Sequence, residues 1–173
     1  CSVMSSHYLG NHFDIHCGGV DNIFPHHENE IAQSCCATGE KFVNYWLHNE
    51  HLLVDNQKMS KSLGNFYTIR DLIDKGFSPE SIRYTLISTH YRQKLNFTLE
   101  KLTNSQKSIN KIKELKRRIG LVEDKNSEGH DFKELSSKML LEFTNCLKND
   151  LNISGALGEM FIWINKVFKE LDN

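Results

Sequence analysis

Three polar segments of the sequence combine residue types that could do chemistry. The first is the run FPHHENE, in which His26 and Glu30 are four residues apart. On a helix this spacing places both side chains on one face, as two ligands of a single metal ion would require. Imidazole and carboxylate both suit Zn²⁺, and Cys1 could add a thiolate. A solvated helix face is the more common reason for such a pair, so the spacing alone does not decide.

The second segment is CGGVD, which covers residues 17–21 at the end of an expected strand. Ligands of open α/β sheets bind where strands end, and glycines there let a backbone approach closely. We expect Gly18 and Gly19 to form a tight turn with positive φ. Asp21 could accept hydrogen bonds from ribose hydroxyls. The alternative is a purely structural turn.

The third segment, KMSKSLGN, covers residues 58–65 and lacks apolar periodicity. We therefore expect a loop. Lys58 and Lys61 could neutralise charge that develops on a leaving pyrophosphate, and a loop containing Gly64 could open and close. A solvated basic loop is the alternative.

The elements that must position these segments follow from periodicity. A strand is predicted over 12–16, a helix over about 25–37, and strands over 43–47 and 52–54. This order indicates a βαβ unit with a parallel sheet. After residue 65 the pattern becomes helical: Thr68 and Ser78 start helices as caps, and three apolar stripes follow, over 109–119, 135–147 and 157–171. Residues 120–131 form the expected linker.

Composition narrows the class of protein. The chain has 173 residues, 25% charged and 39% hydrophobic, with a net charge of −1. This is an ordinary globular mixture, without a membrane-spanning segment or a signal peptide. Five cysteines at irregular spacing favour a reducing, cytoplasmic setting. Residues 101–120 hold seven Lys or Arg, which predicts either a tRNA-backbone contact or a solvated helix face. The chain begins at Cys1 without Met, so we expect a piece of a longer protein.

KMSKS is a signature of class I aminoacyl-tRNA synthetases, and the strings FDIHCGGVDNIFPHHENEIAQS and VNYWLHNEHLLVDNQKMSKSLGNF closely resemble cysteinyl-tRNA synthetase. The resemblance is strong over residues 1–100 and looser beyond. It implies an α/β fold, the second half of a Rossmann-type catalytic domain, followed by an α-helical bundle. The expected domains are 1–66 with the KMSKS loop, 67–98 as a helical connective region, and 99–173 as a helical bundle.

The resemblance also implies site residues. In the family, Zn²⁺ in the amino-acid pocket is held by two cysteines, a histidine and a glutamate. The second cysteine matches Cys1, the histidine matches His26 and the carboxylate matches Glu30; the first cysteine has no counterpart here. His16 matches a histidine that lines the amino-acid pocket.

For ATP, the resemblance assigns the adenosine-site turn to Gly18 and Gly19 and a ribose contact to Asp21. Lys61 is expected to contact ATP directly, and Lys58 to support it as the second catalytic lysine. The implied reaction is attack of the L-cysteine carboxylate on ATP, with Mg²⁺, followed by transfer to tRNA(Cys). We expect a cytoplasmic monomer without membrane association.

Two departures from the family pattern carry expectations. Cys17 stands where the family usually has a glycine, and the HIGH signature is absent from the sequence. We therefore expect the chain alone to have no synthetase activity. Two alternatives remain: a cysteine:amino-sugar ligase of the mycothiol-biosynthesis type, and a non-catalytic zinc- or tRNA-binding module.

Overall fold

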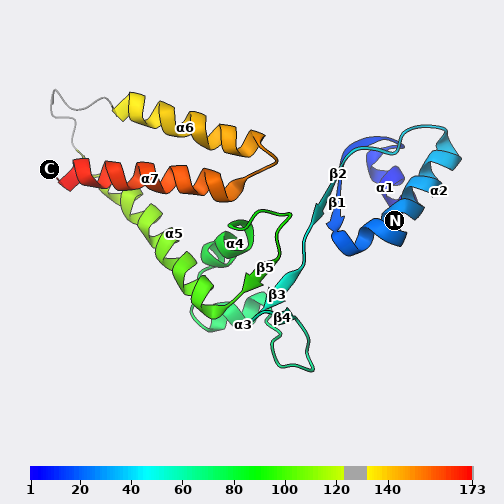
Figure 1. Cartoon of the computed structure of the whole chain (residues 1–173), viewed down its shortest axis with the longest axis horizontal. Helices are drawn as coiled ribbons and strands as arrows, with labels where there is room; N and C mark the ends of the chain where they lie inside the picture. The colour runs from blue at the N-terminus through cyan, green and yellow to red at the C-terminus, as the bar shows by residue number, and fades with distance from the viewer. Residues whose placement is uncertain (123–131, 173) are drawn as a thin grey trace. The chain divides into compact units, whose positions relative to one another are not determined.

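The computed structural model describes residues 1–122 and 132–172, which form two compact units (Figure 1). The first unit contains Cys1–His51 together with Tyr91–Lys94, and the second contains Leu52–His90 together with the chain from Leu95 onward. Most of the predicted linker, residues 123–131, lies outside the described residues. The units divide near His51, whereas the expected domains divide at residues 66 and 98, so that domain division stays a prediction.

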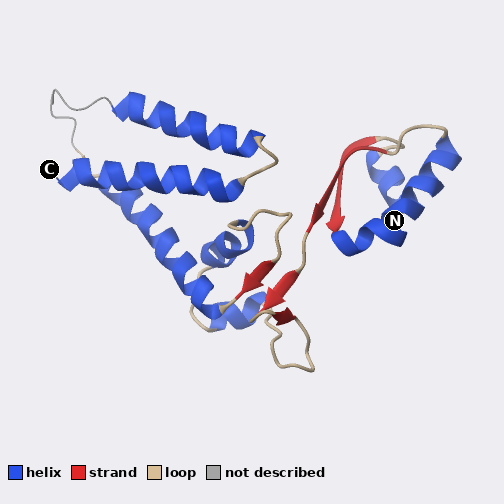
Figure 2. Ribbon diagram, viewed as in Figure 1, coloured by secondary structure: helices blue, strands red, loops and turns tan. Residues whose placement is uncertain are grey.

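The first unit is a βαβ arrangement with an additional helix at its start (Figure 2). Its elements are α1 (Ser2–Leu9), β1 (Phe13–Gly19), the short helical turns η1 (Val20–Asn22) and η2 (Ile23–His27), α2 (Glu28–Thr38) and β2 (Val43–Asn49). Strands β1 and β2 are parallel, with Phe13 opposite Val43 and Gly19 opposite Asn49. The predicted parallel βαβ unit is confirmed. Gly39, in the left-handed conformation at φ 73°, ends α2 close to where the sequence predicts.

The prediction of positive φ at Gly18 and Gly19 is wrong. Both residues belong to β1, and Gly19 has an extended backbone with φ −78° and ψ 160°. Limited space, not backbone conformation, favours glycine here, and most strongly at Gly18, which faces the buried His27 ring. A Cβ on Gly18 would lie 2.5 Å from Cε1 of His27, and a Cβ on Gly19 would lie 2.4 Å from Oδ1 of Asp21.

The second unit combines a small sheet with five helices in its described part. Its elements are β3 (Leu52–Val54), β4 (Gln57–Lys58), α3 (Ile69–Asp74), α4 (Pro79–Ile87), β5 (Leu95–Phe97), α5 (Leu99–Ile119), α6 (Phe132–Lys148) and α7 (Ile153–Asp172). The strand order is β4-β3-β5; β3 is antiparallel to β4 and parallel to β5. Strand β3 was predicted over 52–54, whereas β4 and β5 were not predicted.

Local sequence signals explain where the helices of the second unit begin. Thr68 and Asp71 form a reciprocal capping box at α3, and the hydroxyl of Ser78 accepts from the backbone of Ser81 at α4, with Pro79 in the first turn. The predicted apolar stripes fall on α5, α6 and α7. Two buried clusters result, one of Val54, Leu72, Ile82, Phe97 and Leu102, and one of Leu115, Ile164 and Val167.

Length and hydropathy separate these helices from membrane spans. Within the described residues, none is both long enough and apolar enough to cross a bilayer.

Candidate functional site

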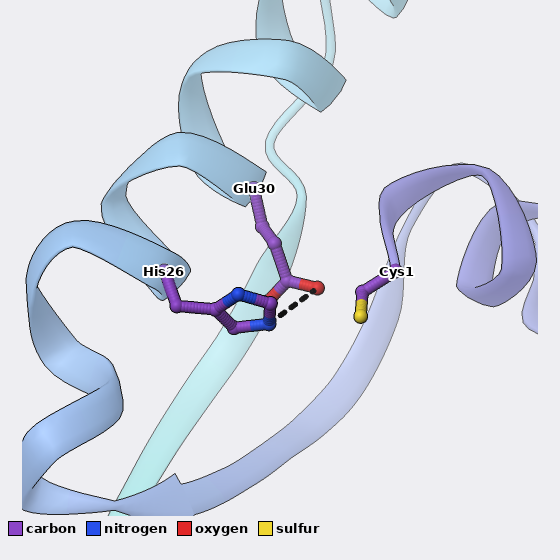
Figure 3. A group of neighbouring side chains, drawn as sticks. All are labelled: Cys1, His26 and Glu30. Atoms are coloured by element: carbon purple, nitrogen blue, oxygen red, sulfur yellow. Dashed lines mark ion pairs between the residues drawn. The ribbon is translucent and has the colours of Figure 1, made fainter.

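The proposed zinc ligands come together in the first unit. Cys1 precedes α1, His26 lies in η2, and Glu30 lies in the first turn of α2. Figure 3 shows the three side chains directed toward one another, and one donor atom from each lies within 4.8 Å of the others. His26 Nε2 is 3.8 Å from Glu30 Oε1. The structure therefore brings Cys1 close to His26 and Glu30, which are far from it in the sequence.

The burial of Glu30 fits a metal ligand. The residue is 3% exposed, and its Oε1 has no hydrogen-bond partner among the described residues. A buried carboxylate oxygen without a partner is costly unless a cation or a donor compensates for the lost solvation. Cys1 is exposed and the His26 side chain is 48% exposed, so the group is open on one side. The donor set and its open side suit zinc held by three protein ligands.

An aromatic and histidine cluster adjoins Glu30. His16 Nε2 lies 2.7 Å from Glu30 Oε2, and His27 Nδ1 lies 2.8 Å from His48 Nε2. Trp46 stacks against His16 with ring centroids 4.8 Å apart and contacts His27 at 4.9 Å. No site role was predicted from the sequence for His27, His48 or Trp46.

Strand alternation carries a signal for these missed residues. In the register of the sheet, His16 is opposite Trp46 and Gly18 is opposite His48. Residues two apart on a strand share a face, so both pairs lie on the same side of the sheet. The predicted strand over 43–47 includes Trp46 but ends before His48, and the register that sets His16 opposite Trp46 is known only from the structure.

Burial lowers the pKa of His27, the most buried histidine described in this cluster. Its pKa is lowered, chiefly by burial and next by the neighbouring His16 imidazole. His27 is 4% exposed. It is therefore neutral at physiological pH and can both donate and accept a hydrogen bond.

The expected adenosine-site residues lie at the end of β1. Asp21 is exposed in η1, where its carboxylate is accessible to a ligand. Gly18 packs against the His27 ring, and Gly19 packs against the Asp21 carboxylate. The two glycines thus allow Asp21 and His27 to approach the strand.

The KMSKS segment lies in the second unit. Lys58 and Lys61 are exposed, and Lys61 Nζ lies 5.4 Å from the centroid of the Phe66 ring. Asn65 closes the segment: its Oδ1 accepts from the Ser60 amide at 2.8 Å, and its Nδ2 donates to the Lys58 carbonyl at 3.2 Å and the Val54 carbonyl at 3.4 Å. Asn65 therefore joins both ends of the loop to β3.

Several of the basic side chains of α5 have partners within the second unit. Arg117 pairs with Glu114, Arg118 reaches Asp172 at 2.7 Å, and Lys111 donates to Asn165. These contacts tie α5 to itself and to α7. Most of the basic residues of this helix are exposed, so the choice between a tRNA contact and a solvated face stays a prediction.

Comparison with known proteins shows which family the chain resembles. Residues 1–107 match the family of class I (C) tRNA synthetase catalytic domains. The chain is 55% identical over 177 residues to the cysteine–tRNA ligase of Brachyspira hyodysenteriae, covering 100% of this chain and 37% of the relative. It is 50% identical to the cysteine–tRNA ligase of Chlamydia trachomatis serovar D, covering 99% of this chain and 36% of the relative. The chain thus spans little more than a third of the length of these curated relatives.

Solved structures support the fold. Methionyl-tRNA synthetase of Mycobacterium tuberculosis, bound by methionyl-adenylate, aligns with a TM-score of 0.71 at 17% identity, over 92% of this chain and 34% of its own. The LeuRS of Agrobacterium radiobacter K84, in a ternary complex with tRNA and LeuAMS, aligns with a TM-score of 0.69 at 16% identity, over 91% and 23%. The expected α/β unit followed by helices is thereby confirmed. The chain belongs to the class I (C) tRNA synthetase catalytic-domain family.

Proposed function

We propose that this chain supplies the amino-acid pocket and the KMSKS loop of a cysteine–tRNA ligase, and that Cys1, His26 and Glu30 hold a zinc ion there. One observation carries the proposal: a buried carboxylate oxygen that has no hydrogen-bond partner in the described part of the chain faces an imidazole and lies beside a thiol. The names and high identity of the curated relatives support the choice of L-cysteine as substrate.

Zinc, when bound, would recognise the substrate thiol by coordinating it as thiolate. The residues of this chain would hold the ion and leave one side of it accessible. Cys1 and His26 are exposed and would hold the ion on the side that is open to the substrate, and the buried Glu30 would offset part of its charge from the opposite side. A hydroxyl binds zinc far more weakly than a thiolate does, so L-serine would be rejected without an editing step.

The ATP-dependent step would use two further groups of this chain. The exposed Asp21 would accept hydrogen bonds from the ribose hydroxyls, with Gly18 and Gly19 leaving room for His27 and Asp21 at the end of β1. Lys61, supported by Lys58, would stabilise the negative charge that develops on pyrophosphate as cysteinyl-adenylate forms, with Mg²⁺ on the phosphates. Acyl transfer to tRNA(Cys) would follow. We place this activity in the cytoplasm, with a monomeric protein.

Metal titration tests the amino-acid pocket directly. We expect the chain to bind Co²⁺ or Zn²⁺ with one ion per chain, and Glu30→Gln to weaken binding by about 100-fold or more, because an amide oxygen is a poor substitute for a carboxylate ligand. Glu28→Gln is the matched control, since Glu28 is exposed in the same first turn of α2. Equal metal affinity of wild type and Glu30→Gln would contradict the proposed ligand set.

Substrate recognition has its own measurement. In the Co²⁺-loaded chain, L-cysteine should add a sulfur-to-cobalt charge-transfer band that L-serine does not produce. If L-serine gave the same spectral change, the thiol-recognition part of the proposal would be wrong.

The sequence contains no HIGH signature, which in the family holds the ATP phosphates from the other half of the fold. We therefore propose that these 173 residues alone do not catalyse ATP–pyrophosphate exchange. Exchange above background by the purified chain, abolished by Lys61→Ala, would refute this.

A further inference from the structure

The two carboxylate oxygens of Glu30 have different surroundings. Oε2 lies 2.7 Å from His16 Nε2, a hydrogen-bond distance. Oε1 has no hydrogen-bond partner among the described residues and is 3.8 Å from His26 Nε2. One oxygen is thus held in place and the other is left for a ligand.

The His16 ring that holds Oε2 is itself fixed by its neighbours. Trp46 stacks on it at 4.8 Å with an interplanar angle of 29°, and the His27 ring lies 4.8 Å away at 40°. Phe42 meets the same ring edge-on at 6.2 Å. Because β1 carries His16 directly opposite Trp46 on β2, the backbone register maintains the stack. The ring has little freedom to turn away from Glu30.

We propose that His16 is a positioning residue for Glu30, and not a contact for the amino-acid substrate. This inference rests on the zinc part of the proposed function. By donating its Nε2 proton to Oε2, His16 holds the carboxylate in place and directs Oε1 toward His26 and Cys1. Carboxylate ligands of metals are commonly hydrogen-bonded in this way, and loss of such a partner weakens metal binding by about 10–100-fold.

A second use of His16 is geometrically conceivable, because donor atoms of His16, His27 and Glu30 also lie within 4.8 Å of one another. Two ligands bound to one tetrahedral zinc at about 2.0–2.1 Å are separated by about 3.3 Å. The His16–Glu30 separation of 2.7 Å is too short for that and fits a hydrogen bond, whereas the His26–Glu30 separation of 3.8 Å fits a shared ion. His27 Nδ1 is also engaged by His48. The distances favour positioning over ligation.

Two substitutions at one site separate these roles. His16→Gln can place its amide NH₂ near the former Nε2 position and still donate to Oε2, whereas the shorter side chain of His16→Asn cannot reach it. His12→Asn is the matched control, since it removes an exposed histidine that directly precedes the same strand and contacts the Lys41 carbonyl, not Glu30. The readouts are the zinc dissociation constant by chelator competition, the visible spectrum with saturating Co²⁺, and the melting curve of the metal-free chain.

We expect His16→Asn to raise the zinc dissociation constant by about 10–100-fold, His16→Gln to recover most of that loss, and His12→Asn to match wild type. The saturated Co²⁺ spectrum should be the same in all variants, because no ligand has been removed. Wild-type zinc affinity in a folded His16→Asn chain would overturn the positioning role. A Co²⁺ spectrum altered by both His16 substitutions would instead make His16 a ligand.

Failure of the underlying function gives a different result. If the wild-type chain bound no zinc, the zinc site and this inference would both fall. If it bound zinc, and Glu30→Gln abolished binding while His16→Asn did not change it, the site would stand and only the role of His16 would be rejected.

Discussion

The two compact units fill their interiors differently. In the described part of the first unit, polar residues are prominent among the buried ones: Ser2, His27, Glu30 and Ser34, beside the apolar Phe42 and Val43. In the second unit, two apolar clusters dominate, centred on Leu102 and on Ile164. Among the described residues, two of these buried polar groups, Glu30 Oε1 and Ser34 Oγ, lack a hydrogen-bond partner. We propose that a metal ion compensates for the burial of Glu30 Oε1. The second unit depends mainly on apolar packing.

This difference predicts separable effects of substitution. Changes in the second unit should lower the free energy of unfolding and leave metal affinity intact, while changes around His27 and Glu30 should alter metal affinity. The predictions below test that separation, beginning with the largest expected effect.

Leu102→Ala should destabilise the second unit by about 2–5 kcal/mol, because Leu102 is 0% exposed in the first apolar cluster and the substitution leaves a cavity. Urea unfolding monitored by circular dichroism measures the loss. Leu99→Ala, at a 37% exposed position of the same helix, should cost much less. A Leu102→Ala loss below 1 kcal/mol would show that this cluster does not hold the unit together.

Gly18→Ala should destabilise the first unit by about 1–3 kcal/mol, because the new Cβ would lie 2.5 Å from the His27 ring and force it to move. Zinc affinity should fall with it, since His27 packs against His16. Thermal unfolding and chelator competition measure the two effects.

Gly158→Ala is the matched control in the second unit. Gly158 lies within α7, and in the described part of the chain no atom comes within 4 Å of an added Cβ. The substitution should stabilise the helix by about 0.5–1 kcal/mol. If Gly18→Ala behaved in the same way, the tight approach of His27 to β1 would be disproved.

Asn65→Ala should release the KMSKS segment, because three hydrogen bonds to Ser60, Lys58 and Val54 are lost, each contributing about 0.5–1.5 kcal/mol. Hydrogen exchange of the Ser60 amide should become faster. Asn65→Asp keeps the acceptor for Ser60 and loses the two donated bonds, so its effect on that amide should be smaller. An unchanged exchange rate of the Ser60 amide in Asn65→Ala would show that the Asn65 hydrogen bonds do not hold the segment in place.

Acidification should weaken the metal-free first unit slightly. The pKa of His27 is lowered from 6.5 in the folded chain by burial, so below pH 6.5 the unfolded chain binds more protons than the folded one. Stability is therefore independent of this group above pH 6.5 and declines as the pH falls toward the lowered value. Unfolding curves in chelator between pH 8 and pH 5 measure the slope. His27→Gln should show a smaller slope, and equal slopes would rule out His27 as the source.

Periodicity and capping predicted much of the fold. The parallel pairing of β1 with β2, the start of α3 at Thr68 and of α4 at Ser78, and the apolar stripes of α5 to α7 all follow from signals within about one turn or one strand. Such signals are local, so they can be read directly. The strand β5 was missed, and β3 was not expected to pair with it, because pairing partners 43 residues apart, such as Leu52 and Leu95, leave no local pattern.

The candidate site was likewise predicted only in part from the sequence. Sequence spacing alone determined that His26 and Glu30 share a helix face, and the family resemblance added Cys1. The tertiary structure decided which Glu30 oxygen is free, that His16 holds the other, and that Gly18 serves the packing of His27. These are contacts of β1 with η2 and α2, whose distances depend on how the chain packs and on no single segment. The sequence thus determined which residues were available for chemistry, and tertiary packing decided how their atoms were arranged.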